Sequence, residues 1–356
     1  MATVLLIGAT GFIGPHVAAA LVRDGHTVVV FHRGSPHSAG QQVRPLPPEV
    51  REIQGDRRQL RDHAKPLRAV RPDVVVDFVL SSGPQARELM TLFRGVASRV
   101  IALSSADVYR ACGVLHGSEP GPIEPVPLTE SSPLRTRLQT YPVDRIRMLQ
   151  QIFSWLDEEY DKIPVEQEIL GPSTALRAGD ASLPGTVLRL PMVYGPGDRL
   201  HRLFPLVKRM DDRRPFILFD DKQAAWRGPR GYVENVAAAI TLAATSPQAA
   251  GQIYNVGEPE SLSELEWARH VAAVVGWTGT FVTLPPEKAP DHLRTPGNLD
   301  QHWAMDTTRI RRELGYVEPI ARAEAIRRSV EWERAHPPAI DPRAFDYEAE
   351  DRAIDS

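Results

Sequence analysis

The segment from residue 1 to residue 33 constrains the fold of this chain more than any other. An apolar run at residues 3–7 is typical of a parallel strand that is buried on both faces. It leads into the turn G-A-T-G-F-I-G at residues 8–14, after which apolar residues recur at helical spacing. A second apolar run, T-V-V-V-F at residues 27–31, predicts the next strand. Strand, glycine-rich turn, helix and strand in this order are the context in which a dinucleotide-binding turn occurs.

Each glycine of this turn has a physical task. Gly8 can adopt the positive φ of a sharp turn, and Gly11 lets the backbone approach a pyrophosphate. Gly14 lets the helix lie close to the sheet, while the free N–H groups at the start of that helix face the phosphates. A tight turn without a ligand is the alternative interpretation. The cofactor contacts expected from this turn are Gly8, Thr10, Gly11, Phe12, Ile13 and Gly14.

Further motifs extend the pattern beyond the first turn. The run S-S-A-D-V-Y at residues 104–109 ends an apolar strand, and L-R-L-P-M-V-Y-G-P-G occupies residues 188–197. Together with the Gly-x-x-Gly-x-x-Gly spacing of the turn, these motifs resemble the extended short-chain dehydrogenase/reductases, which include the NAD(P)-dependent sugar-nucleotide epimerases and dehydratases. The resemblance covers about residues 2–335, apart from an insert at about residues 111–156.

The resemblance implies an α/β fold, namely a doubly wound parallel sheet of the Rossmann type with a smaller, discontinuous C-terminal substrate lobe. We expect residues 1–193 to form the dinucleotide-binding domain and residues 194–336 to form mainly the substrate lobe, with some segments returning to the sheet. The proline-rich insert leaves the predicted active-site strand, which favours a lid over the substrate. The segment 337–356, which is rich in Asp and Glu, is expected to form a surface tail.

The end of the second predicted strand bears on the choice of cofactor. It reads F-H-R-G at residues 31–34 and lacks the acidic residue that holds the adenosine ribose of NAD. Arg33 can instead pair with a 2′-phosphate, so NADP is the expected preference and NAD stays possible; a solvated loop cation is the alternative. Asp56 is an adenine contact by resemblance, or an ordinary helix N-cap. Phe78 and Val79 are further expected cofactor contacts, because they follow a predicted buried strand at the carboxyl edge of the sheet. The resemblance adds Pro191 and Val193.

The resemblance also implies a catalytic serine, tyrosine and lysine. Ser105 matches the serine, whose hydroxyl can hydrogen-bond a substrate oxygen as charge develops on it. The family's Tyr-x-x-x-Lys motif puts phenol and ammonium on one helical face, where the ammonium lowers the pKa of the phenol and holds the nicotinamide ribose. Lys162 matches that lysine and Glu166 follows it as in the family, but Glu158 occupies the position of the tyrosine.

Three candidates for the acid–base group therefore stay open. Tyr160 would point away from Lys162 on a regular helix, but an irregular first turn would let it reach the site. Glu158 could act as a replacement acid, and Tyr141 is followed by Arg145 at the spacing of the lysine. We place Tyr160 with Lys162 first, and loss of the proton chemistry is the alternative.

A further set of residues is expected at the substrate. Asp107 matches a catalytic acid of sugar dehydratases in this family, and Arg230 matches an arginine that binds the diphosphate in sugar-nucleotide enzymes. Trp226 and Arg227 could add stacking and cationic contacts, and Tyr194 opens the turn that leads into the substrate lobe. The alternative for either arginine is an ion pair with a nearby carboxylate.

Composition limits the classes of function. A net charge of −3 gives no support for binding to nucleic acid or to a membrane surface. The single cysteine, Cys112, excludes an internal disulfide framework and a cysteine-built metal cluster, and no metal is expected. No run approaches the roughly eighteen apolar residues of a membrane span, and the start lacks the pattern of a signal peptide, so we expect a cytoplasmic protein.

These features predict an NAD(P)-dependent oxidoreductase, epimerase or dehydratase that transfers hydride at a carbinol or carbonyl carbon. The substrate would be sugar-nucleotide-like or another small molecule, the motifs leave the net reaction open, and a homodimer is a possible assembly. The alternative is a cofactor-binding protein without redox turnover, either a sensor or a nucleic-acid-associated relative, because the glycines are intact while the tyrosine is displaced.

Overall fold

A seven-stranded parallel sheet is the core of the computed structural model, which describes residues 1–34, 44–138, 140, 141, 143–153, 155–171 and 183–354. The strand order within these residues is β10-β6-β5-β4-β1-β2-β3. The strands are β1 (Thr3–Ile7), β2 (Thr27–His32), β3 (Arg51–Gln54), β4 (Val74–Asp77), β5 (Arg99–Ser105), β6 (Gly185–Leu190) and β10 (Ile253–Asn255). Because neighbouring strands are parallel, their carboxyl ends lie along one edge of the sheet.

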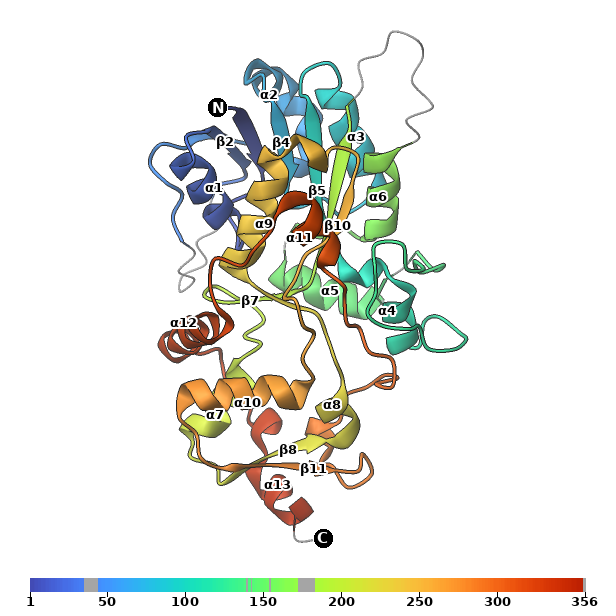
Figure 1. Ribbon diagram of the computed structural model, residues 1–356, viewed down its shortest axis with the longest axis vertical. Helices are drawn as coiled ribbons and strands as arrows, with labels where there is room; N and C mark the ends of the chain where they lie inside the picture. Colours follow the sequence, from blue (N-terminus) through green and yellow to red (C-terminus); the bar gives the residue numbers. More distant parts are fainter. Residues whose placement is uncertain (35–43, 139, 142, 154, 172–182, 355–356) are drawn as a thin grey trace.

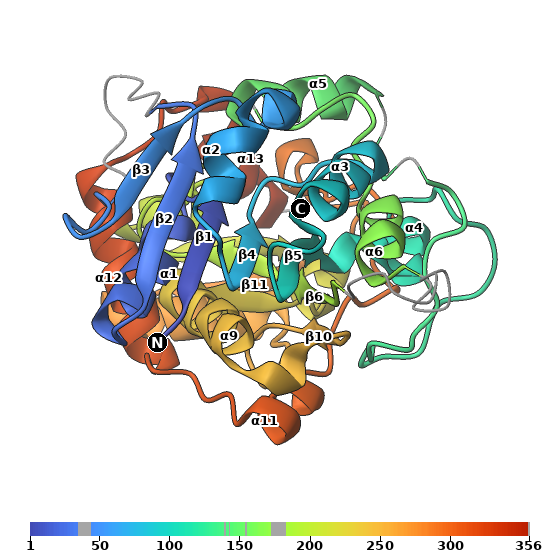
Figure 2. The ribbon, with the colours of Figure 1, turned by 90° about the horizontal axis from the view of Figure 1, so that it is seen from above.

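Helices cover both faces of this sheet (Figure 2). Successive strand residues point to opposite faces, so Val4 and Leu6 belong to one apolar cluster while Leu5 and Ile7 belong to the other. The first cluster contains α1 (Gly14–Arg23) and α9 (Val233–Thr245), and the second contains α2 (Ala64–Ala69), α3 (Gly83–Phe93) and α6 (Lys162–Leu170). The expected doubly wound parallel sheet is confirmed.

A second, smaller layer lies below the sheet in Figure 1. Its centre is the parallel pair of β8 and β11, while β7 pairs with β9 near the junction with the sheet. The elements are β7 (Met192–Tyr194), α7 (Phe204–Asp211), β8 (Phe216–Asp220), α8 (Asp221–Ala225), β9 (Arg230–Tyr232), α10 (Glu264–Val275), β11 (Thr280–Leu284) and α12 (Arg322–Ala335). Ser263 and Glu266 form a capping box at the start of α10.

The insert at residues 111–156 is partly helical, and its residues 139, 142 and 154 lie outside the described part of the chain. It contains most of α4 (Arg110–Leu115) and all of α5 (Val143–Ile152). The buried guanidinium of Arg135 anchors it, because Nη2 lies 3.0 Å from Oδ2 of Asp161 and Nε donates to the carbonyl of Asp107 over 2.6 Å. The insert is thus tied to the carboxyl end of β5 and to the start of α6.

Asn255, the last residue of β10, joins segments that are far apart in the sequence. Its Oδ1 accepts a hydrogen bond from the Tyr109 hydroxyl over 2.6 Å. Its Nδ2 donates to the carbonyls of Leu128 in the insert and Asp306 before α11 (Thr308–Leu314), over 3.0 and 3.1 Å. This fully buried amide therefore connects the sheet, the insert and the C-terminal third of the chain.

The segment from Pro337, which we expected to be a surface tail, folds back onto the smaller layer instead. It ends in α13 (Tyr347–Ile354), whose Glu350 is fully buried. Oε1 of Glu350 lies 2.7 Å from Nη2 of Arg209 on α7 and 3.1 Å from Nε2 of His292. A buried carboxylate requires such partners. Glu350, one of the acidic residues that suggested a surface tail, therefore docks the helix against α7.

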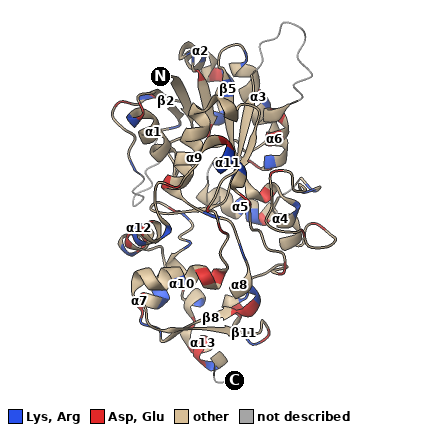
Figure 3. Cartoon of the chain, viewed as in Figure 1, with Lys and Arg blue, Asp and Glu red and all other residues tan. Residues whose placement is uncertain are grey.

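Acidic and basic residues are interspersed over both layers (Figure 3). Among the helices of the described residues, none combines the length and the apolar character that crossing a bilayer would require.

Candidate active site

A cavity of about 150 Å³ opens at the carboxyl ends of β1, β2 and β4. The turn after β1 contributes Gly8, Thr10, Gly11 and Phe12 to its wall. Gly8 has a φ of 75°, and a Cβ there would lie 2.7 Å from the side chain of Val79. A Cβ on Gly11 would meet no heavy atom within 4 Å, so the backbone there is open to a ligand. This is the geometry of a dinucleotide cradle.

Gly14 does not line this cavity, but it allows the close packing of α1 behind the turn. A Cβ at Gly14 would lie 2.3 Å from backbone atoms of Ala9, so only glycine lets the start of α1 pack against the turn. Ile13, Phe78 and Val193 pack in the apolar cluster of that face, and Pro191 lines the neighbouring cavity described below. Val79 lines the cradle itself.

The far end of the cradle carries the residues expected at the adenosine. Arg33 is exposed and lines the cavity together with Asp56 and Arg58. Asp56 accepts a hydrogen bond from the Arg58 N–H over 2.9 Å as an N-cap, and its Oδ2 lies 2.8 Å from the Arg58 guanidinium. Asp56 is thus an N-cap that also lines the cradle, and its contact with adenine stays a prediction. His32 is buried, and its Nδ1 accepts from the Gly34 N–H over 3.1 Å.

A second cavity, of about 440 Å³, lies beyond the end of β5; we call it the site cavity. Of the expected residues it brings together Ser105, Asp107, Tyr160, Pro191 and Trp226. The insert forms one wall with Tyr141, Arg145, Leu149, Phe153, Trp155 and Leu156. Because Trp155 also lines the cradle, the two cavities adjoin.

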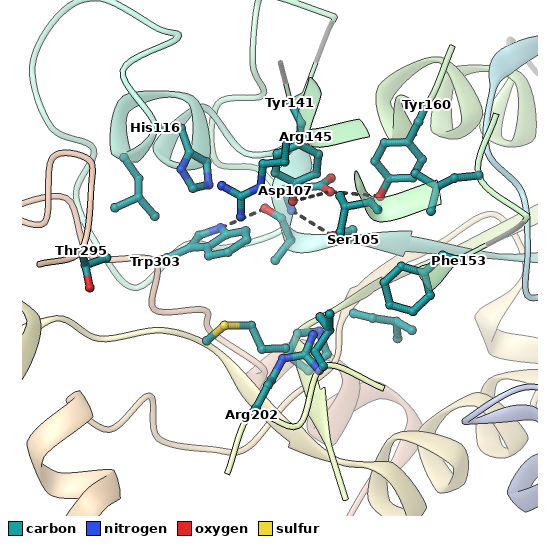
Figure 4. A pocket seen from close by; sticks show the side chains of 18 of the residues that line it. Ser105, Asp107, His116, Tyr141, Arg145, Phe153, Tyr160, Arg202, Thr295 and Trp303 are labelled. Carbon is teal, nitrogen blue, oxygen red and sulfur yellow. Dashed lines mark hydrogen bonds between the residues drawn. The ribbon is translucent and has the colours of Figure 1, made fainter. Parts of the chain in front are cut away.

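Asp107 is the centre of the polar groups in the site cavity (Figure 4). Its Oδ2 accepts from the Tyr160 hydroxyl over 3.1 Å and from the Tyr141 hydroxyl over 3.5 Å. Its N–H donates to Oγ of Ser105 over 3.2 Å. Its Oδ1 is buried without a hydrogen-bond partner among the described residues, and burial raises the pKa of this carboxyl.

Lys162 and Tyr160 meet, although the spacing between them is shorter than in the family motif. The side chain of Asp161 caps α6 at the Ile163 N–H over 2.8 Å, so the helix begins at Lys162 and Tyr160 precedes it. Nζ of Lys162 lies 5.6 Å from the ring centroid of Tyr160 and donates to the carbonyls of Leu80 and Leu103. Burial lowers the pKa of Lys162 to about 8.

The structure differs from our expectation about the proton on Tyr160. We expected the lysine to lower the pKa of the phenol, but burial and the adjoining carboxylate of Asp107 raise that pKa well above its ordinary value. Tyr160 is therefore held as a protonated phenol. A group in this state can donate a proton but is a poor base at neutral pH. Glu158, the candidate replacement acid, is exposed and lies outside the wall of the site cavity, whereas the third candidate, Tyr141, lines it.

Glu166, on the turn after Lys162, has a structural partner. Its two oxygens lie 3.0 and 2.7 Å from Nε and Nη2 of the buried Arg189 on β6, and Ser104 donates to Oε1 over 2.6 Å. This bidentate pair fixes α6 against β5 and β6.

Both arginines expected at a substrate diphosphate are paired with carboxylates. Arg227 lies 2.9 Å from Glu266, and Arg230 forms an ion pair with Glu264. Tyr194 is buried and donates to Glu258 over 2.9 Å. Trp226 lines the site cavity, where its Nε1 donates to the Gln301 carbonyl over 3.0 Å.

Several residues of these walls belong to no motif that can be recognised in the sequence. His116 and Trp303 line the site cavity close to Asp107, and Arg202 faces them from the other side (Figure 4). Arg199 lines the cradle, with its guanidinium 6.0 Å from the Phe153 ring centroid. No pattern of neighbouring residues indicates Trp303, because it is placed by a distant contact. Its Nε1 donates over 3.0 Å to the carbonyl of Ala106, 197 positions earlier in the chain.

Residues 4–257 match the family model described as the NAD dependent epimerase/dehydratase family. The chain belongs to this family. It is accordingly an NAD-dependent enzyme of the kind that includes reductases, epimerases and dehydratases.

Individual members of the family are distant from this chain. The 2-alkyl-3-oxoalkanoate reductase of Stenotrophomonas maltophilia is 28% identical over 361 residues, which cover 91% of this chain and 97% of that protein. The UDP-glucuronic acid 4-epimerase from Bacillus cereus, solved with UDP-glucuronic acid and NAD, has a TM-score of 0.65 and 18% identity, covering 94% of this chain and 99% of that one. The dTDP-glucose 4,6-dehydratase from Bacillus anthracis, solved with NAD, has a TM-score of 0.64 and 14% identity, covering 96% and 100%. These two structural likenesses show a shared fold.

Proposed function

We propose that this family member is an NADP-dependent reductase of ketones whose substrate has an apolar body and an anionic group. The observation that carries the proposal is the buried hydroxyl of Tyr160, which donates to Oδ2 of Asp107 over 3.1 Å in a cavity with largely apolar walls. Burial and this carboxylate raise the pKa of the phenol, so it keeps its proton at neutral pH. A positioned acid of this kind is what reduction of a carbonyl requires, because the oxygen must receive a proton.

The cradle fits a dinucleotide, since its glycines leave the backbone at Gly11 open and bring α1 close to the turn. The turn residues would hold the pyrophosphate, and Lys162 would hold the nicotinamide ribose. Arg33, which lines the far end of the cradle, pairs with the 2′-phosphate and favours NADP. When bound, the reduced cofactor supplies a hydride to the carbonyl carbon.

The residues of the chain supply the proton and the orientation. Ser105 donates a hydrogen bond to the carbonyl oxygen, and Tyr160 gives its proton to that oxygen as the carbon–oxygen double bond becomes a single bond. The alcohol leaves with the proton, and the negative charge that forms on the phenol lies close to the Lys162 ammonium. One ketone, one hydride and one proton thus give one alcohol.

The walls of the site cavity favour an apolar substrate over a sugar nucleotide. The arginines at the diphosphate positions, Arg227 and Arg230, are already matched by carboxylates. Apolar side chains dominate the walls: Leu115, Leu149, Phe153, Leu156, Leu190, Met192, Leu200, Leu299 and Trp303. Arg145 is exposed and lines the cavity, with its guanidinium 5.1 Å from the Tyr141 ring centroid, so it can hold an anionic group. The similarity to a 2-alkyl-3-oxoalkanoate reductase supports the same substrate class.

The test is cofactor oxidation by the purified protein with NADPH and NADH, using 3-oxo acids and 2-alkyl-3-oxo acids as substrates. We expect turnover with NADPH, a much lower rate with Tyr160→Phe, and an unchanged rate with Tyr347→Phe, a tyrosine bonded to Asp212 in the other layer. Absence of turnover with all of these ketones, or a Tyr160→Phe variant as active as the native protein, would overturn the proposal.

A further inference from the structure

A third cavity, of about 340 Å³, lies within the smaller layer; we call it the lobe cavity. Residues of α7, β8 and α10 form its walls. Met192 and Arg202 line both this cavity and the site cavity, so these side chains form the partition between the two. A substrate arm that extends from the site cavity past Met192 would enter the lobe cavity.

The charges on the wall of the lobe cavity are paired within the protein. Arg230 forms an ion pair with Glu264, and Arg209 lies 2.7 Å from the fully buried carboxylate of Glu350. Arg202 lies 2.6 Å from Asp198. A phosphate would have to compete with these carboxylates, and freeing a buried arginine from its partner is costly.

The rest of the wall is apolar. The apolar side chains are Met192, Leu203, Pro205, Leu206, Ile217, Leu218, Phe219, Trp267 and Leu293. The uncharged polar members of the described wall are Gln223 and Tyr194, and the Tyr194 hydroxyl is already bonded to Glu258. A nucleotide base needs several donors and acceptors from its site, whereas an alkyl chain needs none.

We infer that the lobe cavity binds an alkyl arm of the substrate, which passes the Met192–Arg202 partition while the ketone stays beside Tyr160. This inference rests on the proposed function and extends it, because it requires a substrate with a long apolar arm. Each methylene buried in the cavity raises affinity about fourfold, the factor that corresponds to about 0.8 kcal/mol per CH2. The gain ends when the cavity is full.

Binding of saturated fatty acids from butanoate to dodecanoate, measured by calorimetry without substrate turnover, tests this inference. We expect the dissociation constant to fall about fourfold per methylene once the chain reaches the lobe cavity. The variant Leu206→Trp, which fills the cavity from α7, should remove this dependence on length. The control Leu242→Trp changes a partly buried leucine of α9 that faces neither cavity, and it should keep the dependence.

The same variants are then compared in ketone reduction, as the ratio of kcat/KM for a long-chain 3-oxo acid to that for a short one. A ratio that collapses in Leu206→Trp but not in Leu242→Trp supports the lobe cavity as the site of the arm. If the protein reduces ketones but neither the dissociation constant of the fatty acids nor the kcat/KM ratio depends on chain length, the inference is overturned and the proposed function stays intact. Absence of reduction for every ketone would overturn the proposed function, whatever the fatty acids show.

Discussion

At the scale of single residues, two phenols compete for one carboxylate in the site cavity. Tyr160 donates to Asp107 over 3.1 Å and Tyr141 over 3.5 Å, and the two rings are stacked with centroids 6.3 Å apart. Only Tyr160 lies beside Lys162, which can offset the charge of a phenolate. In the proposed reaction, Tyr160 therefore gives the proton and Tyr141 orients the carboxylate of Asp107.

We predict that Tyr160→Phe lowers kcat for ketone reduction by about 10²–10⁴-fold, the usual contribution of a positioned acid. Tyr141→Phe should lower kcat by less than tenfold, because its hydrogen bond to Asp107 is at the limit of hydrogen-bond length. Since the pKa of Tyr160 is raised well above 10, its deprotonation should not reduce the rate between about pH 6 and pH 9. Equal losses in the two variants would contradict the assignment.

Lys162 is expected to reduce the stability of the fold. Its pKa is lowered from 10.5 to about 8, so the folded state loses this proton at a lower pH than the unfolded state does. The destabilisation caused by the buried ammonium is complete below pH 8. It shrinks as the pH rises through the pKa of the folded state and vanishes above the unfolded pKa of 10.5. We predict that Lys162→Met abolishes ketone reduction but raises the free energy of unfolding by about 1–3 kcal/mol at pH 7.

The lower end of that range allows for the carbonyls of Leu80 and Leu103, which lose their donor in the variant. Urea unfolding at pH 7 and at pH 10 measures the effect. The stabilisation should be smaller at pH 10, and a variant that is less stable than the native protein at pH 7 would show that burial of the ammonium is not costly.

Among the elements, α13 is held by the fully buried carboxylate of Glu350. Replacing Glu350 by alanine leaves the guanidinium of Arg209 buried without its carboxylate. Breaking one partner of a buried pair costs about 3–5 kcal/mol, so we predict a loss of that order in Glu350→Ala. The exposed Glu348 on the same helix is the control, and Glu348→Ala should stay within about 0.5 kcal/mol of the native protein. Equal stabilities of the two variants would mean that α13 is not docked.

At the scale of the whole molecule, the cradle brings together parts of the chain that are otherwise separate. Its wall contains the turn after β1, Trp155 of the insert, and Gly197 with Arg199 from the start of the second layer. A dinucleotide bound there would touch all three. Ligand binding to the folded state alone stabilises a protein by RT ln(1 + [L]/Kd), which is about 2.7 kcal/mol at 100 times Kd.

We therefore predict that NADPH raises the Tm by a few degrees and does so at lower concentrations than NADH. The variant Arg33→Ala should weaken NADPH binding at least tenfold, because the pairing with the 2′-phosphate is lost, and should leave NADH binding unchanged. Arg23→Ala, on α1 and away from the cradle, is the matched control. Equal stabilisation by both cofactors in the native protein would remove the case for NADP.

The sequence predicted the features that depend on neighbouring residues. The strands around the glycine turn and the N-cap at Asp56 both follow from local sequence. The site depends instead on contacts between distant positions, such as the one from Tyr160 to Asp107, 53 positions apart. Whether a phenol is protonated depends on its burial, which the spacing of Tyr160 and Lys162 did not reveal. The docking of α13 was missed because its partner, Arg209, lies 141 positions earlier.

The position of β10 has a consequence for how the molecule is made. Strands β1 to β5 and the glycine turn are complete once residue 105 has left the ribosome, and domains generally begin to fold from the N-terminus during synthesis. The next edge of the sheet must wait for β6, and β6 must wait for β10 at residue 253. Until Asn255 arrives, the Tyr109 hydroxyl and the Leu128 carbonyl lack the amide that joins them. The nascent chain thus carries β5 as an unpaired sheet edge while the insert is synthesised, and β6 as the edge during synthesis of much of the second layer. We therefore expect the completion of the sheet by β10 and the ordering of the site to occur together, late in folding.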